Sequence, residues 1–511
     1  MISGTSSDAG KSVVTTAVCR VLARRGLSVA PFKAQNMSNN SMVTGGGTGG
    51  GTGGGTEIGR AQWVQAIAAR ATPEAAMNPV LLKPGSDRRS HVVVMGQPAG
   101  ELAANEFAGG RAALADAAYA AYDDLCARFD VVVCEGAGSP AEINLRPWDY
   151  TNMGLAQHGQ IPTVLVGDID RGGVFASMYG SIALLDSADQ ALVAAMVINK
   201  FRGDLDLLRP GLDTLQELTG RPVLGVLPWA SGLWLDSEDA LDLQVRPTRT
   251  PGVAAETLRV AVVRLPRISN FTDIDALTLE PSIDLTFVEE PAGLSGADVV
   301  VLPGTRATLA DLGWLRERGI ADAIVAHASR GGVVLGICGG FQMLGRTIDD
   351  PEGAEGSAGA CTDGLGLLDV ATVFGRDKVL RVPTGEALGA PVSGYEIHHG
   401  RVEPGARGEP FLDGLREGGA FGTMWHGSLE GDEFRRAFLR TAAAYVRRDG
   451  FAPDPTLRFE DHRQGRIDAL ADAVEQHLDV DALVALVDHG APKDLPTISP
   501  RLVAALGDPR S

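Results

Sequence analysis

A cysteine flanked by glycines is the first residue in this sequence whose context indicates chemistry. The apolar run VVLGI (333–337) predicts a buried strand, and FQMLG (341–345) resumes with helical spacing after Cys338, Gly339 and Gly340. Glycine on both sides lets the backbone take positive φ angles, so we expect Cys338 to project from a sharp turn. The N-terminus of the following helix favours the thiolate. Free cysteines are usually inert core residues, but this context favours a nucleophile.

A cysteine nucleophile needs a base, and histidine is the usual one. His426 follows the short apolar run GTMW, and the fold rather than sequence proximity would bring it to Cys338. His398 and His399, in SGYEIHHGR, are rival candidates. A lone histidine is more often a surface or hydrogen-bonded structural residue. The position of His426 between a strand and Gly427 favours it over the other two.

The N-terminus carries a second chemical motif, a phosphate loop that runs into a predicted helix over 13–26. Backbone N–H groups of such a loop, with the helix N-terminus, bind an anion. Lys11 would reach the terminal phosphates of ATP, and the Ser12 hydroxyl would hold Mg²⁺. The loop is one residue longer than G-x-x-x-x-G-K-[ST], because Thr5 stands where the first glycine would. The residues predicted to bind ATP here are Gly4, Thr5, Ser6, Ser7, Asp8, Ala9, Gly10, Lys11 and Ser12.

Three predicted strands end in polar residues, and strand ends are where a doubly wound sheet binds ligands. Lys33 follows VAPF and suits a phosphate or a carboxylate, although a solvated turn is an equal alternative for this stretch. Glu135 ends the strand DVVVC, and we assign it to the Mg²⁺ shell. Cys134 would point to the opposite face, into the core. Asn199 ends a further strand, where its amide could contact the nucleotide base.

Composition excludes several classes of protein. The net charge of −19 argues against nucleic acid or an anionic membrane as the main partner. The five cysteines lie far apart without a CxxC pair, which is typical of a reducing cytoplasm and indicates neither a disulfide framework nor a structural zinc site. No apolar run approaches the length of a membrane span, and the N-terminus lacks the features of a signal peptide. We therefore expect a cytoplasmic protein.

Alternating strands and helices predict an α/β protein with parallel sheets, divided into two main domains. The predicted parts are a P-loop domain over 1–228, a linker over 229–257, a second α/β domain over 258–445 and a helical extension over 446–511. The extension would carry one helix near 466–488 and would either cap the second domain or meet another subunit, as in a homo-oligomer.

Three further local predictions fall in the first domain. The low-complexity tract TGGGTGGGTGGGT (44–56) has no side chains with which to build a core, so it reads as a flexible surface loop. A helix should open at Glu57 and continue to about Arg70. An alanine-rich helix is expected over about 101–128.

These motifs resemble two known families. The Cys338 turn, the PGT turn around Gly304 and His426 resemble a class I glutamine amidotransferase domain, which has a flavodoxin-like fold, and the N-terminal half resembles the dethiobiotin-synthetase-like P-loop fold. Both halves in one chain, with FKAQNMSNNS, EGAGSPAEINLR, DIDRGGVFA, NKFRGD and SGYEIHHGR in order, closely resemble the cobyric acid synthase family of cobalamin biosynthesis over roughly residues 1–440.

The resemblance implies a reaction and its substrates. Cys338 and His426 would release ammonia from glutamine, and main-chain donors at Gly304 and Gly339 would stabilise the oxyanion. The P-loop domain would use ATP and Mg²⁺ to phosphorylate the b, d, e and g carboxylates of a corrinoid, adenosylcobyrinic acid a,c-diamide. Ammonia would then displace phosphate, so we expect the domains to pack together around a sequestered path.

Two departures and two rival interpretations remain. Most class I amidotransferases have a glutamate two residues after the histidine, where this chain has Ser428, so the third member of the site is unassigned. The glycine tract looks like an insertion. Cobyrinic acid a,c-diamide synthase, which joins the same domain types, is the nearest alternative. A non-catalytic P-loop scaffold is a more distant one, disfavoured by the intact Cys338 and His426.

Overall fold

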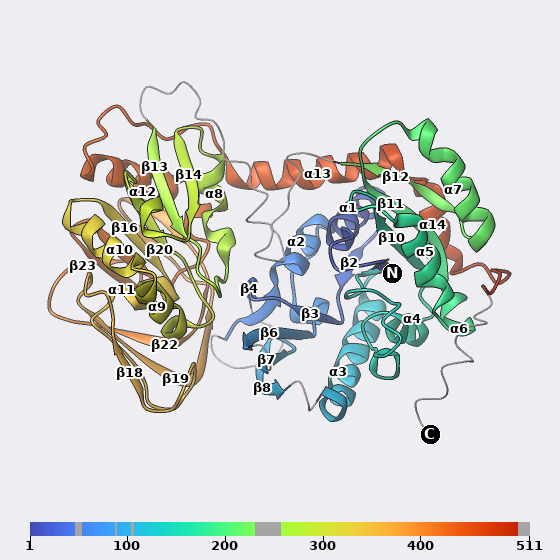
Figure 1. Cartoon of the computed structure of the whole chain (residues 1–511), viewed down its shortest axis with the longest axis horizontal. Coiled ribbons are helices and arrows are strands. Elements are labelled where there is room, and N and C mark those ends of the chain that lie inside the picture. The colour runs from blue at the N-terminus through green and yellow to red at the C-terminus, as the bar shows by residue number, and fades with distance from the viewer. Residues whose placement is uncertain (46–53, 87–88, 104–106, 230–256, 499–511) are drawn as a thin grey trace.

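The computed structural model contains two α/β domains that lie side by side (Figure 1). We refer to residues 1–229 as the first domain and to residues 257–445 as the second. The structure describes residues 1–45, 54–86, 89–103, 107–229 and 257–498. Most of the glycine tract and of the predicted linker therefore lies outside the described residues. Within the described ranges, no helix combines the length and apolar character needed to cross a membrane.

The first domain is built on a parallel sheet, as predicted. Strands β1, β10, β11 and β12 pair in that order and β2 pairs with β9. A bridge between Ile2 and Glu135 joins the two groups. Within β10, Leu165 packs into one hydrophobic cluster and Val164 and Val166 into another, so both faces of the sheet are buried. The strands are β1 (Ile2–Gly4), β2 (Val29–Phe32), β9 (Val131–Cys134), β10 (Thr163–Asp168), β11 (Val193–Phe201) and β12 (Val223–Pro228).

Two predicted helices of the first domain begin later than expected. Glu57 belongs to a strand, and α2 begins at Arg60; residues 101–103 also lie in a strand, and α3 begins at Phe107. The helices are α1 (Lys11–Arg24), α2 (Arg60–Ala68), α3 (Phe107–Arg128), α4 (Met153–Gly159), α5 (Val174–Ala183), α6 (Ser187–Gln190) and α7 (Leu205–Thr219).

A smaller sheet and a hairpin complete the first domain. The sheet has the order β3-β6-β7-β8, and β4 pairs with β5 around the glycine tract. The hairpin meets the second domain, where the Gly55 N–H donates to the Leu380 carbonyl oxygen at 3.1 Å. The strands are β3 (Gln35–Met37), β4 (Ser41–Thr44), β5 (Thr56–Gly59), β6 (Val80–Ser86), β7 (Arg89–Val94) and β8 (Gln97–Ala103).

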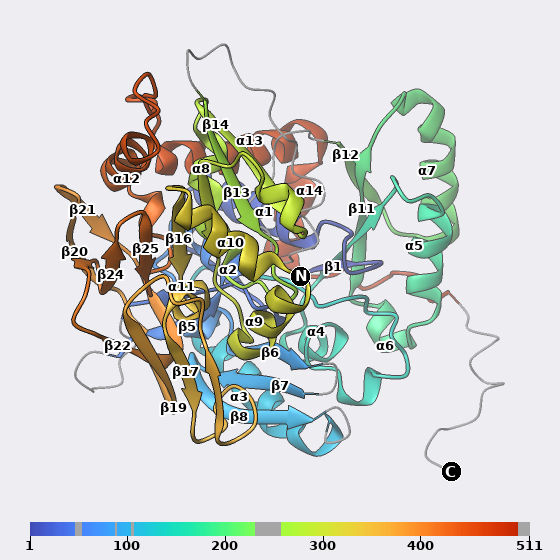
Figure 2. The same ribbon diagram turned by 60° about the vertical axis from the view of Figure 1, so that its left-hand side comes forward.

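The second domain has its own sheet, in the order β14-β13-β15-β16-β25-β24-β23. Its parallel part runs from β14 to β25, and helices pack against it (Figure 2). The strands are β13 (Leu258–Val263), β14 (Ile283–Val288), β15 (Val299–Leu302), β16 (Val333–Ile337), β23 (Glu409–Phe411), β24 (Gly414–Glu417) and β25 (Ala420–Thr423). The helices are α8 (Asp275–Leu279), α9 (Thr308–Glu317), α10 (Ile320–Ser329), α11 (Gly339–Leu344) and α12 (Asp432–Tyr445).

A second small sheet, β18-β17-β19-β22, and the hairpin β20-β21 extend this domain. Their bounds are β17 (Thr347–Asp350), β18 (Ala360–Asp363), β19 (Val370–Arg381), β20 (Thr384–Ala387), β21 (Ala390–Ser393) and β22 (Glu396–Pro404). The β4–β5 hairpin of the first domain lies against β19 and β22, so these strands form part of the boundary between the domains.

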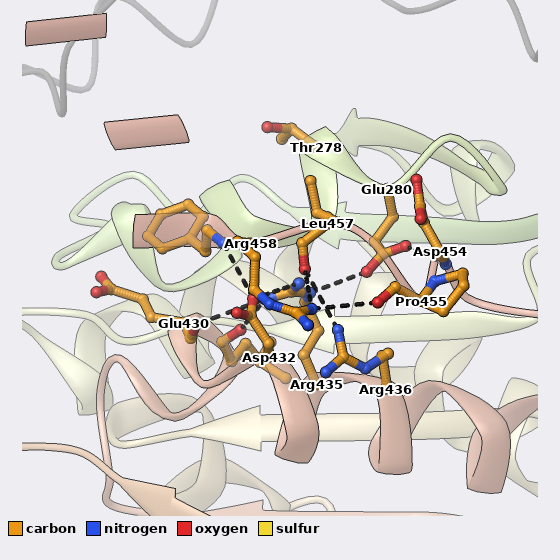
Figure 3. Close-up of polar contacts among 12 residues, drawn as sticks. Thr278, Glu280, Glu430, Asp432, Arg435, Arg436, Asp454, Pro455, Leu457 and Arg458 are labelled. Atoms are coloured by element: carbon orange, nitrogen blue, oxygen red, sulfur yellow. Dashed lines mark hydrogen bonds and ion pairs between the residues drawn. The ribbon is translucent and has the colours of Figure 1, made fainter. Parts of the chain in front are cut away.

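The C-terminal extension contains two helices where one was predicted, and it contacts both domains. The predicted single helix is two, α13 (Phe459–His477) and α14 (Val480–His489). Instead of only capping the second domain, α13 crosses to the first and packs along α1 (Figure 1). Its first residue is held on the second domain by Asp432, whose Oδ1 accepts the Phe459 N–H at 3.0 Å. The same oxygen accepts buried Arg435 at 2.8 Å, and Arg435 also donates to Glu280 at 2.9 Å (Figure 3).

Candidate active site

Cys338 lies in a sharp turn between β16 and α11, as predicted, but the left-handed residue is the cysteine itself. Its φ is 50°, whereas the flanking glycines do not have positive φ. The glycines are needed for space: a Cβ on Gly340 would lie 1.8 Å from the Leu302 carbonyl oxygen, and one on Gly339 would lie 2.7 Å from Thr305 Cγ2. Positive φ in a non-glycine residue is strained, and such strain concentrates at functional sites.

His426 lies between a carboxylate and the thiol. Its Nδ1 is 2.6 Å from Asp273 Oδ2, and the imidazole lies close enough to Cys338 for the sulfur to raise the pKa of His426. The other oxygen of Asp273 accepts the Gly427 N–H at 2.8 Å. All three side chains are buried. The site therefore brings together a nucleophile, a base and a group that orients the base.

The charges of this triad stabilise one another. Burial lowers the pKa of His426, but Asp273 and then Cys338 outweigh burial and raise it to about 10. A positively charged imidazole therefore lies beside the cysteine sulfur, where it can deliver a proton to a leaving group. The geometry thus prepares Cys338 for attack on an electrophilic carbon.

Asp273 is the member of the site that sequence reasoning did not find. The position where an acid was expected is Ser428, which lies in a short 3₁₀ helix after His426. Asp273 precedes His426 by 153 residues, in the 3₁₀ turn Phe271–Ile274 before α8. Its position in the sequence does not distinguish it, because Asp275, two residues further on, is also an aspartate and is also buried.

A cavity of about 470 Å³ opens over the triad. Cys338, His426 and Gln342 line it from the second domain, while Lys83 and His91 line it from the first. Among the described residues, the Gln342 side-chain nitrogen is buried without a hydrogen-bond partner. The cavity therefore reaches across the domain boundary.

Gly304 and Gly339, predicted as oxyanion donors, both lie beside the triad. A Cβ on Gly304 would lie 2.9 Å from His426 Cε1. Gly339 begins α11, where the first backbone N–H groups of a helix have no intrahelical acceptor. Their placement fits the predicted role, which stays a prediction.

The rival histidines line the cavity but lie outside the triad. His398 Nδ1 is 2.7 Å from the Gly400 carbonyl oxygen. Burial, followed by the charges of Lys378 and Arg306, lowers the pKa of His399 to about 4. The structure therefore brings His426, rather than either residue of this pair, to Cys338.

The phosphate loop lies between β1 and α1, as predicted. Gly10 has a φ of 95°. The Lys11 ammonium donates to the carbonyl oxygens of Ser6 at 2.8 Å and Ser7 at 3.0 Å, and also to that of Gly138 at 3.0 Å. The amine is thereby held over the loop, in position for an anion.

Glu135 forms hydrogen bonds with two other residues predicted for this site, Ser12 and Lys33. Its carboxylate accepts Ser12 Oγ at 2.8 Å, Lys33 Nζ at 2.9 Å and Gln65 Nε2 at 2.5 Å. Burial raises the pKa of Glu135, but these partners, with Lys33 foremost, hold it below its ordinary value. Gln65 was missed, because a glutamine inside a helix gives no signal in the sequence.

Asn199 and Asp8 make separate contacts at the loop. The Asn199 amide donates to the Ala9 carbonyl oxygen at 2.9 Å, and a Cβ on Gly10 would lie 2.0 Å from its nitrogen. Asp8 forms an exposed ion pair with Arg171 at 2.5 Å. Asn199 thus supports the loop directly, and its predicted contact with a base stays a prediction.

The residues present fit a magnesium ion. Ser12 and Glu135 bring a hydroxyl and a carboxylate oxygen within 2.8 Å of each other. Mg²⁺ prefers hard oxygen ligands and usually takes one or two from the protein, with water and phosphate supplying the rest. These two side chains would hold it beside the phosphates.

Comparisons with known proteins agree with the two sites. Residues 1–241 match the model of the CobQ/CobB/MinD/ParA nucleotide binding domain, and residues 259–434 match that of the CobB/CobQ-like glutamine amidotransferase domain. The protein is thus a ligase of the glutamine amidotransferase type with a nucleotide-binding domain. Cobyric acid synthases of Mycobacterium ulcerans and Mycobacterium tuberculosis (strain H37Rv) are each 62% identical to it, and each alignment covers 98% of this chain and 99% of the relative. The chain belongs to the cobyric acid synthase family.

Among solved structures, a glutamine amidotransferase shares 21% identity at a TM-score of 0.29, covering 37% of this chain and 98% of its own. That likeness is too weak to carry an argument. The fold class and the enzyme class predicted from the sequence are confirmed by the family models and the relatives.

Proposed function

We propose that the protein amidates the b, d, e and g carboxylates of adenosylcobyrinic acid a,c-diamide, with glutamine as nitrogen donor and ATP as the activating substrate. The observation that supports this most is the presence of a Cys–His–Asp triad and a phosphate loop in one chain, across whose length the 62% identity to cobyric acid synthases extends. One glutamine and one ATP are consumed for each amide formed.

The second domain supplies ammonia. Cys338 Sγ attacks the side-chain carbonyl carbon of glutamine, and donors at Gly304 and Gly339 stabilise the oxyanion. The C–N bond breaks as His426 delivers its proton to the departing nitrogen, leaving a glutamyl thioester on Cys338. Water then releases glutamate, with His426 as the general base and Asp273 holding its ring.

The first domain activates the carboxylate. Lys11 binds the terminal phosphates of ATP within the backbone cradle of the loop, and Lys33 adds positive charge beside them. Ser12 and Glu135 would hold Mg²⁺, which when bound would neutralise phosphate charge. The corrinoid carboxylate attacks the γ-phosphorus and releases ADP, and ammonia then displaces phosphate to leave the amide.

The same reaction also bears on the partners and the location of the protein. These are small-molecule substrates, so the enzyme needs neither nucleic acid nor a membrane as a partner, and we place it in the cytoplasm. A homo-oligomer is compatible with this function.

Product analysis with two variants tests the proposal. Purified protein with ATP, Mg²⁺, glutamine and cobyrinic acid a,c-diamide should yield the tetra-amidated product by mass spectrometry. Cys338→Ala should lose glutamine hydrolysis by roughly 10²-fold or more but still amidate with ammonium chloride. Lys11→Ala should fail with either nitrogen source, because phosphoryl transfer precedes amidation.

Two outcomes would contradict this assignment. Wild-type glutamate release by Cys338→Ala would remove Cys338 from its role. Conversion of cobyrinic acid to its a,c-diamide, with no reaction of the diamide itself, would instead identify the a,c-diamide synthase.

A further inference from the structure

We propose that Asn270 is a positioning residue of the cysteine site, that Ser41 of the first domain holds Asn270 in place, and that Asn40 holds the same turn at Thr272. The proposal rests on the proposed function in taking Cys338 and His426 as the glutamine-hydrolysing pair. It gives a task to the end of the segment FKAQNMSNNS (32–41), which the phosphate chemistry uses only at Lys33.

Asn270 is buried and has left-handed backbone angles, with φ 49° and ψ 38°. Asparagine tolerates this conformation better than most residues with a side chain. Its Oδ1 accepts the Ser41 N–H at 3.2 Å, and its Nδ2 donates to the Tyr395 hydroxyl at 3.3 Å. Because a backbone N–H can only donate, the contact with Ser41 fixes which way the amide faces.

A second contact supports the same turn. The Thr272 hydroxyl is 3.5 Å from Asn40 Oδ1, and Thr272 immediately precedes Asp273. The residues on both sides of the domain boundary are at most 3% exposed. The turn that carries the triad carboxylate is therefore held from the first domain at two points.

Tyr395 carries the support to His426. The two rings stack with their centroids 5.3 Å apart and 25° between their planes. The Tyr395 N–H donates to the His426 carbonyl oxygen at 3.0 Å, and the His426 N–H donates back at 2.9 Å. Asn270 thus supports the base twice, through the Asp273 turn and through Tyr395.

The same segment of the first domain begins in the phosphate site. Lys33 donates to Glu135 at 2.9 Å, and Glu135 accepts the Ser12 hydroxyl at 2.8 Å. Backbone hydrogen bonds hold the segment along its length, from Lys33 to Met77 at 2.9 Å and from Ser38 to Leu82 at 3.1 Å.

The far end of the segment is fixed as well, because the Asn40 carbonyl oxygen accepts the Arg60 N–H at 3.0 Å. The Arg60 guanidinium in turn pairs with Glu430 at 2.7 Å, four residues after His426. A shift of Lys33 towards bound phosphate therefore has a continuous route to the triad, along this segment and its hydrogen bonds. Coupling between the phosphate site and the triad is measured by following glutamine hydrolysis while the phosphate site is filled.

The variant Asn270→Gly removes the amide and keeps the left-handed backbone, which glycine adopts without strain. Glutamate formation is measured with and without Mg²⁺ and the β,γ-imido analogue of ATP. We expect kcat for glutamate formation to fall by about tenfold to a hundredfold, since misplacing a catalytic group by about 1 Å can cost 10²-fold. The KM for glutamine should change little, and amidation driven by ammonium chloride should be unchanged.

In the wild type the ATP analogue should alter the rate of glutamine hydrolysis, and the Asn270→Gly variant should lose that response.

Two further variants keep the test decisive. Tyr395→Phe retains the stacked ring and removes only the hydroxyl, so it should show a smaller loss in the same direction even if Asn270→Gly does not fold. Asn39→Ala is the matched control, because the amide of Asn39 contacts the Pro84 carbonyl oxygen at 3.5 Å within the first domain. It should respond to the analogue like the wild type.

Either of two results would overturn the proposal: a wild type whose hydrolysis ignores the analogue, or an Asn270→Gly variant that responds as the wild type does. Glutamate formation needs no acceptor, so an error in the proposed corrinoid substrate would leave these readings intact.

Discussion

The carboxylate that orients His426 belongs to Asp273, and it governs both the geometry and the charge of the base. At 2.6 Å from Nδ1, it fixes the ring and leaves the other nitrogen for Cys338. It is also the largest of the influences that raise the pKa of His426, after burial, which lowers it. An oriented, positively charged imidazole is what a thiolate nucleophile requires.

Asp273→Asn should therefore change the pH profile as well as the rate. Because the raised pKa of about 10 for His426 depends on this negative charge, its removal lowers that pKa and the imidazole loses its proton at lower pH. We expect the alkaline limb of glutamine hydrolysis to move to lower pH, with a loss of roughly 10²-fold or more in kcat. Steady-state glutamate formation across pH measures both.

Amidation with ammonium chloride is the internal control for Asp273→Asn and should stay at the wild-type level. An unmoved alkaline limb would mean that another group sets the ionisation of His426.

The residues found from the sequence share one property, which is that a local pattern marks them. Cys338 has its glycines, Lys11 its loop and Glu135 its strand end. Asp273 and Gln65 have no such mark, because their partners come from distant parts of the chain and only the folded backbone brings them together. Local signals could therefore predict the reacting groups but not the groups that orient them.

Among the elements, α13 has the least expected position. It packs along α1, the helix that begins at the phosphate loop, and the two share an apolar contact to which Ile467, Leu470 and Val474 contribute. Arg24 adds ion pairs to Asp468 at 3.0 Å and Asp472 at 2.6 Å. The apolar contact should dominate, because exposed ion pairs contribute little.

Two substitutions on α13 separate these contributions. Ile467 is fully buried, so Ile467→Ala should reduce the free energy of unfolding by about 2–5 kcal/mol. The side chain of Asp472 is 66% exposed, so Asp472→Ala should cost at most about 1 kcal/mol. Urea unfolding followed by tryptophan fluorescence compares them, and equal costs would mean that charge rather than burial attaches the helix.

The break between α13 and α14 shows why element boundaries were harder to predict. The apolar spacing continues through 466–488, and the local signal within it is Asp479, whose side chain accepts the Ala482 N–H at 2.9 Å as the N-cap of α14. The helix stops because the chain pairs with β12: the Asp479 N–H donates to the Leu224 carbonyl oxygen at 2.8 Å, and Leu478 bridges Gly225. A Cβ on Gly225 would lie 2.0 Å from the His477 carbonyl oxygen, so that approach requires glycine. This contact between distant segments is invisible in either segment alone.

At the scale of the whole molecule, the two domains share buried charge. Glu57 of the first domain pairs with Lys83 at 2.5 Å and with Lys378 of the second domain. Burial raises the pKa of Glu57, but Lys378 and Lys83 outweigh it and hold the pKa well below the ordinary value of 4.5. A depressed carboxyl pKa stabilises the folded state above that ordinary value, and the contribution is lost as pH falls through the folded pKa. At neutral pH this carboxylate should therefore contribute its full stabilisation to the domain boundary.

Lys378→Met tests whether this boundary retains ammonia. Lys378 lines the cavity above Cys338, and its loss leaves Glu57 with a partner from its own domain only. Breaking one side of a buried charge cluster costs up to about 3–5 kcal/mol, less here because Lys83 remains. We expect the domains to separate more often, so that ammonia escapes and more than one glutamate forms per amide. Amidation with ammonium chloride should be unaffected.

Arg381→Met, an exposed cation three residues along the same strand, is the matched control and should keep one glutamate per amide. A ratio of one in Lys378→Met as well would show that retention of ammonia does not depend on this cluster.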